Sequence, residues 1–211
     1  MSIKSGVTKG TPARVLFGAG VYFQGVTYKE DTPPTDDEIL AALMGATQEG
    51  GTLTITPEFF RPEIDGVTVA LEETEGKIGE AGQMEVSFVE LTPEYLAHTI
   101  IGTVQDSKDG QYSVIKPSDL GSGHYYKGFG FYGNLMDGRP VIILAKKALC
   151  TSGFTTDAKN KTNSLFKGTF EFRSDIESGV TKLPYVIFIR KESGWTKADI
   201  ADVNVTTPAA S

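Results

Sequence analysis

The chain lacks several features that would assign it to common protein classes. It has one cysteine, Cys150, among 211 residues, so no internal disulfide can form, which fits a reducing compartment. No apolar run approaches the roughly 20 residues that a membrane-spanning helix requires, which predicts a soluble protein with no membrane partner. Residues 1–6 lack the apolar stretch of a secretory signal, and we therefore expect synthesis and assembly in a cytoplasm.

Residues that carry chemistry are also scarce. His98 and His124 are the only histidines, and neither has an Asp, a Cys or the other histidine at metal-ligand spacing. The acidic cluster at residues 72–75 lacks the spacing of a calcium-binding loop, and nothing pairs its carboxylates in the manner of a glycosidase. We therefore predict no metal, no cofactor and no enzymatic activity, and a glycosidase is the least favoured alternative.

Basic residues are too few and too dispersed for a protein that grips nucleic acid through its phosphates. The formal net charge is −7 and the pI is near 4.9. Between Thr47 and Ile100 there are eleven acidic residues against Arg61 and Lys77, whereas the rest of the chain has sixteen acidic and eighteen basic residues. The negative charge is concentrated in this segment, which does not exclude a protein along which DNA must slide.

Two alternating segments within this acidic region predict β-strands. At residues 52–58 threonines alternate with apolar residues, and at 84–90 apolar residues alternate with polar ones, which is the period of half-buried strands. The segment between them, from Arg61 to Gly82, contains four glycines and the acidic cluster. We expect a long hairpin loop at about residues 61–82.

Two short helices are predicted from their capping signals. Thr35 begins a capping box, and Thr92 followed by proline and glutamate is a second helix start. In the second helix we expect Leu96 and Ile100 to face the sheet, with Tyr95 as a further candidate.

The remaining periodic segments are all strand-like. They lie at residues 15–26, 125–135, 141–149, 166–172 and 185–189. We predict a mainly β chain, an antiparallel β-sandwich or half-barrel with one or two short helices and long loops. A single domain spans residues 1–211, with an N-terminal arm at about 1–14 and a flexible C-terminal tail at about 197–211.

Several short motifs follow one another in an order typical of one family. They are GAT with GG at 45–51, PE with R and IDG at 57–66, VELTPEYL at 89–96, GRPVIIL followed by KAL at 138–149, and FKGTFEF at 166–172. Together they resemble the major tail tube proteins of long-tailed bacteriophages, particularly the group from Gram-positive hosts. The resemblance covers roughly residues 15–190, and this chain departs from the family pattern at Pro62 and in a longer polar tail.

The resemblance implies a structural virion protein. In that family, six subunits form a ring, each contributes four strands to a continuous inner β-barrel, and rings stack into a hollow tube through long loops and terminal arms. The implied partners are further copies of the chain, the tail-tip or initiator complex, the tape-measure protein and the tail terminator protein. Double-stranded DNA would pass through transiently during ejection, and the implied location is the virion tail, assembled in the host cytoplasm.

Residue roles follow from assigning the four barrel strands to 52–58, 84–90, 139–149 and 165–173. The candidate lumen-facing residues are Thr52, Thr54, Thr56, Glu58, Glu85, Ser87, Lys167, Thr169 and Glu171, for which an ordinary solvated sheet face is the alternative. The candidate inter-subunit loop residues are Arg61, Ile64, Asp65, Val67, Val69, Leu71, Glu72, Glu73 and Glu75, for which a plain surface loop is the alternative.

A carbohydrate-binding β-sandwich module of a phage or bacterial surface protein is the alternative function. Exposed aromatic residues would then form a stacking platform for sugars, although the same residues can pack a core. The candidates are Tyr125, Tyr126, Phe129, Phe131 and Tyr132.

Overall fold

The computed structural model describes residues 16–63, 65, 69, 72–156, 164–177, 179 and 182–191. The predicted N-terminal arm and C-terminal tail lie outside the described residues, as do Ile64, Val67 and Leu71 of the predicted hairpin loop.

The described chain is mainly β, with antiparallel sheets and two short α-helices, which confirms the predicted fold class. The elements are β1 (Leu16–Phe23), α1 (Asp36–Ala41), β2 (Thr47–Phe60), η2 (Glu72–Thr74), β3 (Gly76–Phe88), α2 (Pro93–Thr99), β4 (Gly102–Asp106), β5 (Ser113–Pro117), η3 (Ser122–His124), β6 (Tyr126–Leu135), β7 (Pro140–Cys150), β8 (Phe166–Phe172) and β9 (Tyr185–Ile189).

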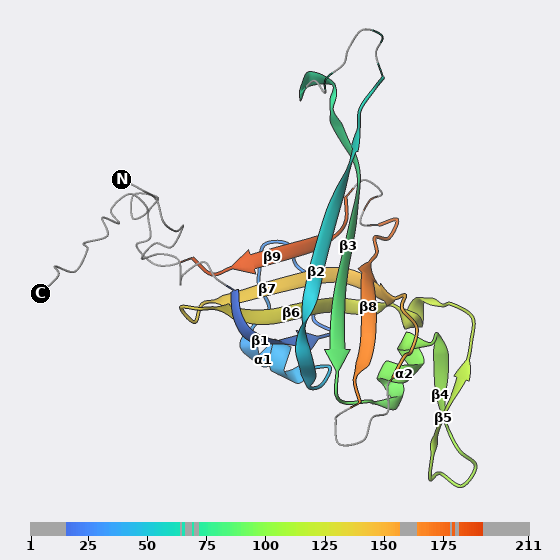
Figure 1. Cartoon of the computed structure of the whole chain (residues 1–211). Helices are drawn as coiled ribbons and strands as arrows, with labels where there is room; N and C mark the ends of the chain where they lie inside the picture. Colours follow the sequence, from blue (N-terminus) through green and yellow to red (C-terminus); the bar gives the residue numbers. More distant parts are fainter. Residues whose placement is uncertain are drawn as a thin grey trace, which may run out of the picture.

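One seven-stranded sheet provides most of the fold, in the order β1-β6-β7-β8-β3-β2, with β9 also paired to β7. β7 pairs with β9 over Val141–Ala145 and with β8 only over Ala148–Cys150, so both strands lie along the same edge of β7. Figure 1 shows the result: β2, β3 and β8 run across the direction of β1, β6, β7 and β9. The sheet therefore folds over itself into two crossed layers.

The main core lies between these two layers. It is built largely from aromatic rings, among them Phe129 and Phe170, which stack with ring centroids 4.6 Å apart. The largest fully buried side chains are Tyr126, Phe23, Phe88, Phe129, Phe170, Met84 and Leu144. Aromatic pairs at such distances stabilise a core beyond the area they bury, which explains how a small sandwich holds together.

A second, smaller cluster lies on the other side of the β1-β6-β7-β9 layer, where α1 covers it. Ile39 of α1 packs there with Phe23, Val26, Ile142 and Leu144. α1 begins as the sequence predicts: the Thr35 side chain accepts a hydrogen bond from the Glu38 amide, and the Glu38 carboxylate accepts one from the Thr35 amide.

Three details differ from the sequence-based expectations. β3 begins at Gly76, so the loop after Phe60 is shorter than the predicted 61–82. The small sheet of β4 and β5 was not predicted, although the Asp109-Gly110 dipeptide between two short alternating segments is a hairpin signal. Ile100 is exposed rather than facing the sheet, because α2 ends at Thr99 and Ile100 is its C-cap.

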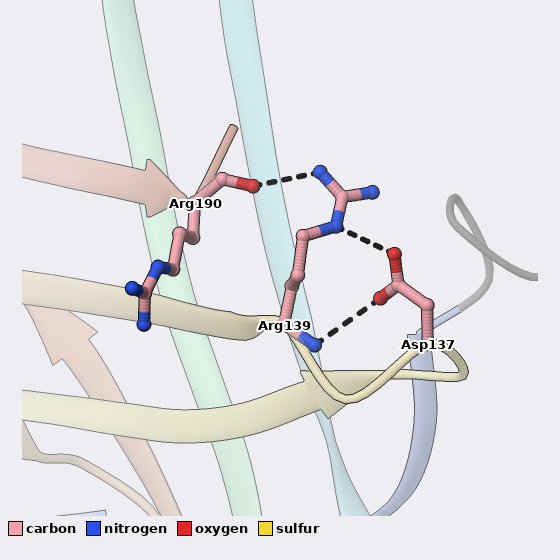
Figure 2. Close-up of polar contacts among 3 residues, drawn as sticks. All are labelled: Asp137, Arg139 and Arg190. Atoms are coloured by element: carbon pink, nitrogen blue, oxygen red, sulfur yellow. Dashed lines mark hydrogen bonds and ion pairs between the residues drawn. The ribbon is translucent and has the colours of Figure 1, made fainter. Parts of the chain in front are cut away.

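A polar cluster fixes the turn between β6 and β7 to the end of β9 (Figure 2). The Arg139 side chain donates from Nε to Asp137 Oδ2 at 2.6 Å and from Nη1 to the carbonyl oxygen of Arg190 at 2.8 Å. Leu16 pairs with Leu135 on the other flank of the same turn. The first and the last described residues therefore lie at one corner of the molecule.

Candidate functional site

The predicted lumen residues come together on one side of β2, β3 and β8, which we call the polar face. Glu85 is opposite Thr52 on one side and Thr169 on the other. Ser87 is opposite Lys167. The polar face comprises Thr52, Thr54, Thr56, Glu58, Glu85, Ser87, Lys167, Thr169 and Glu171, and the register places all nine on the side of the sheet opposite the main core.

Burial on the polar face is uneven. Thr52, Glu85 and Lys167 are exposed, and Thr169 is half-buried. Ser87 was expected in solvent but is only 9% exposed, because it is short and lies directly beside the longer side chain of Lys167. The face is therefore a shallow polar surface and not a row of free side chains.

Carboxylates on the polar face are partly held by neighbouring donors. Glu171 accepts a hydrogen bond from Thr151 Oγ1 at 2.9 Å and forms an ion pair with Arg173. The hydrogen bond from Arg173, followed by the one from Thr151, lowers the pKa of the Glu171 carboxyl. Gln83 Nε2 donates to Glu85 Oε1 at 3.3 Å. With Lys167 included, the face carries charges of both signs.

Two of the nine residues lie away from the other seven along β2. β8 pairs with β3 only from Gln83 to Phe88, whereas Thr56 and Glu58 are opposite Ala81 and Gly79. They therefore lie where β2 and β3 continue alone, as the two-stranded hairpin that extends far beyond the rest of the described chain in Figure 1.

Gly82, which the sequence predicts at the end of a loop, lies within β3 instead. Gly82 lies where the two layers meet: a β-carbon there would approach Phe172 Cδ2 to 2.6 Å and Leu183 Cδ2 to 2.9 Å. Glycine is thus needed for close packing at that position, and the strand continues because its backbone pairs with β2.

The far part of the hairpin exposes apolar side chains that the sequence analysis did not single out. Phe59, Phe60 and Ile78 are 55%, 54% and 65% exposed. Successive strand residues point to opposite faces, so Phe59 and Phe60 cannot share one buried side. The rule predicts that one of the two is exposed, and both are exposed because no other strand covers this part of the hairpin among the described residues.

The loop beyond the hairpin is closed by an ion pair. Arg61 Nε lies 2.7 Å from Glu75 Oε1, which joins the two ends of the predicted inter-subunit loop. Asp65, Val69 and Glu72 are exposed, with Val69 at 67%. The backbone of Glu73 lies in η2, and its side chain is outside the described residues.

The edge of the polar-face layer is open at β2. β2 pairs with β3 and has no second strand partner among the described residues. The predicted fourth barrel strand, at 139–149, joins this layer only through the three residues Ala148–Cys150, because the rest of β7 pairs with β6 and β9. A strand at the edge of a sheet is a template for pairing with another strand.

No protein-family model matches the sequence, and a search of curated proteins gives no match either.

The candidate chemical groups lie apart from the polar face. Cys150 is 3% exposed, and its Sγ lies 3.6 Å from Ser152 Oγ. His124 accepts at Nδ1 from the Gly121 amide, with Nε2 at 3.1 Å from Ser118 Oγ. Within the described residues, no three His, Cys, Asp or Glu side chains gather as a metal site. None of the described helices is long and apolar enough to cross a membrane.

The aromatic platform of the alternative function is not formed as predicted. Tyr126 and Phe129 are 1% and 0% exposed and belong to the main core, so they are not available to stack on a sugar. Tyr125, Phe131 and Tyr132 are each partly buried.

Proposed function

We propose that this chain is a structural subunit that assembles as stacked six-membered rings into a hollow phage tail tube, which conducts DNA during ejection. One observation carries the proposal: the polar face is a continuous antiparallel surface with an open strand edge, and it leads into a projecting hairpin with exposed apolar side chains. An open edge and an exposed apolar ribbon are liabilities in a monomer, and assembly would cover both.

The dimensions of such a barrel suit duplex DNA. If six copies each contribute four strands, 24 strands spaced about 4.8 Å apart and tilted about 40° give a backbone diameter near 48 Å. Side chains about 5 Å long on each wall leave a channel wide enough for a duplex. β7 pairs with β8 only through Ala148–Cys150. The fourth strand that each copy adds to the barrel would therefore be the shortest of its four strands.

The chemistry of the polar face suits a wall along which DNA slides. Threonines and carboxylates dominate the polar face. Lys167 is its one lysine, and the neighbouring Arg173 forms an ion pair with Glu171. Phosphates are repelled by such a surface at short range, so the passing duplex would not be held. Assembly in a host cytoplasm and a final location in the virion tail belong to the same proposal.

Negative-stain electron microscopy of the concentrated protein tests the proposal. We expect hollow tubes with sixfold end views, either spontaneously or after seeding with purified tail-tip complexes. Dispersed subunits in both the unseeded and the seeded sample would overturn it.

Variants of the hairpin make the same experiment specific. Phe60→Asp with Ile78→Asp should prevent tube formation while the monomer remains folded, because both side chains are exposed in the single chain. Tyr112→Asp is the matched control, since Tyr112 is 69% exposed on the turn between β4 and β5, away from the hairpin. Tubes from the double variant would remove the hairpin from the assembly interface.

A further inference from the structure

The contact between α2 and the main sheet buries a polar atom of His98. His98 Nδ1 on α2 is buried without a hydrogen-bond partner among the described residues. Most buried polar side-chain atoms in proteins are hydrogen-bonded, so this nitrogen calls for an explanation. The buried hydroxyls of Tyr95 and Tyr126 lie near the Thr99 side chain.

The contact itself is made by aromatic rings. The Tyr95 ring lies 4.8 Å from Phe88, and the His98 ring lies 4.8 Å from Tyr126, centroid to centroid. Tyr95 and Tyr126 are 6% and 1% exposed. Thr99 Oγ1 donates to the Tyr95 carbonyl within the helix, at 2.8 Å.

α2 belongs to a unit that is separate from the main sheet, which we call the α2 module (residues 93–117). Among the described residues, β4 and β5 pair with each other and with no strand of the seven-stranded sheet. Ser118, the residue after the module, ties the end of β5 to the end of α2, since its amide and its hydroxyl both donate to the Ile101 carbonyl. Figure 1 shows the module at one side of the molecule, so the aromatic contact is a seam between two parts.

Several titratable groups face His98. Glu94 lies on its own helix, His124 on η3 and Tyr126 on β6, and Cys150 of β7 lies close to Tyr126. Burial lowers the pKa of His98, the neighbouring His124 lowers it further, and Glu94 opposes both. Burial also raises the pKa of Tyr95 to about 12, so the tyrosines stay neutral and supply no counter-charge near neutral pH.

We propose that protonation of His98 releases the α2 module from the main sheet, which makes the seam a pH-sensitive joint. A protonated imidazole carries a hydrogen on Nδ1, and this atom is buried with no acceptor among the described residues. A buried donor without an acceptor carries its full desolvation penalty, which is larger for a charged group. The released module frees that nitrogen to bond with water.

The direction of the pH dependence follows from the lowered pKa of His98. The released state binds the proton more tightly, with the ordinary histidine pKa of about 6.5. Docking is therefore strongest above that pH and weakens as the pH falls through it. For each unit by which docking lowers the pKa of His98, the equilibrium constant for release of the α2 module rises by up to about tenfold in acid.

Cys150 provides a built-in reporter of release. It is the only cysteine of the chain, is 3% exposed, and belongs to the same core cluster as Tyr95 and Tyr126. When α2 moves away, the Cys150 thiol becomes accessible to a labelling reagent in solution. The test measures the rate at which 4,4′-dithiodipyridine labels Cys150 at pH 7.5 and 5.5, divided by the rate for the unfolded protein at the same pH. This division removes the effect of pH on the thiol.

We expect the normalised labelling rate of the native protein to rise several-fold at pH 5.5. This rate should not change with low concentrations of urea, because a local opening exposes little surface, whereas global unfolding exposes much more. His98→Phe keeps an aromatic ring and His98→Gln keeps polarity, and neither variant should show the rise. His124→Gln controls for the second histidine and should retain most of it. A native rate that is unchanged in acid, or an equal rise in both His98 variants, would overturn the proposal.

Discussion

The guanidinium of Arg139 donates a hydrogen bond of 2.8 Å to the main-chain carbonyl of Arg190 (Figure 2). The two residues are 51 positions apart in the sequence, and the Arg190 amide in turn donates to the Pro140 carbonyl at 3.2 Å. This pair joins the β6–β7 turn to the end of β9. It therefore fixes the C-terminal end of β9 to the sheet.

Arg139→Lys should therefore destabilise the β9 end of the sheet. Lysine retains the charge beside Asp137 but cannot reach the Arg190 carbonyl and the carboxylate together as the planar guanidinium does. Loss of one such hydrogen bond should lower the free energy of unfolding by about 1 kcal/mol, measured by urea denaturation. Lys127→Arg, on an exposed position of β6, is the control and should leave the midpoint unchanged. An unchanged midpoint for Arg139→Lys would show that the hydrogen bond from Arg139 to the Arg190 carbonyl adds no stability.

Strong local patterns made several elements predictable. β9 has the bounds that its apolar run indicates, and β8 alternates as expected, with Phe170 buried and Lys167 exposed. The two N-caps, Thr35 and Thr92, also stand where their side chains predict, because capping depends on residues only three positions apart.

Features that depend on a distant partner were not predictable. Gly82 lies within a strand because its backbone pairs with β2, and glycine is needed there because Phe172 and Leu183, both distant in the sequence, leave no room for a side chain. The buried Nδ1 of His98 likewise requires Tyr126 of β6 beside it. For the polar face, alternation gave the correct side of each strand, whereas the burial of Ser87 requires the register with β8.

Backbone strain at Ile101 gives a second prediction. Ile101 follows the C-cap of α2 with φ of +55°, a conformation that β-branched residues rarely adopt and glycine adopts freely. Ile101→Gly should be more stable than Ile101→Ala by about 1 kcal/mol, since both lose the side chain but only alanine keeps the strain. At ordinary helix or strand positions the order is reversed. Thermal unfolding of the two variants decides, and an alanine variant at least as stable as the glycine variant would contradict the left-handed geometry.

The crossing of the two layers at Gly51 gives a third prediction. A β-carbon on Gly51 would lie 1.8 Å from Tyr22 Oη and 2.5 Å from the Glu85 carbonyl oxygen. Gly51→Ala should lower the free energy of unfolding by about 1–3 kcal/mol, because β2 must move away from β1 or from β3. Gly76→Ala is the matched control in the same hairpin, as no atom of the described residues lies within 4 Å of its β-carbon position. Equal unfolding midpoints for both variants would mean that β2 does not cross as closely as described.

The charge of the polar face gives the fourth prediction, which depends on the proposed tube. Glu58→Lys with Glu85→Lys changes two exposed side chains and shifts the formal net charge from −7 to −3, since each substitution adds two units. The stability of the monomer should change by no more than about 0.5 kcal/mol per site. Tubes of this variant should retain duplex DNA at low salt and release it as salt rises, because new lysines in the wall bind phosphates through counterion release.

The matched control for the wall is Glu30→Lys with Asp31→Lys, which makes the same change of charge on the exposed segment between β1 and α1. Co-sedimentation of tubes with labelled duplex measures both variants against the native protein. Only the polar-face variant should retain DNA, since only its lysines would line the channel. Equal retention by the control would mean that DNA binds the outer surface, and no retention by either variant would remove β2 and β3 from the wall.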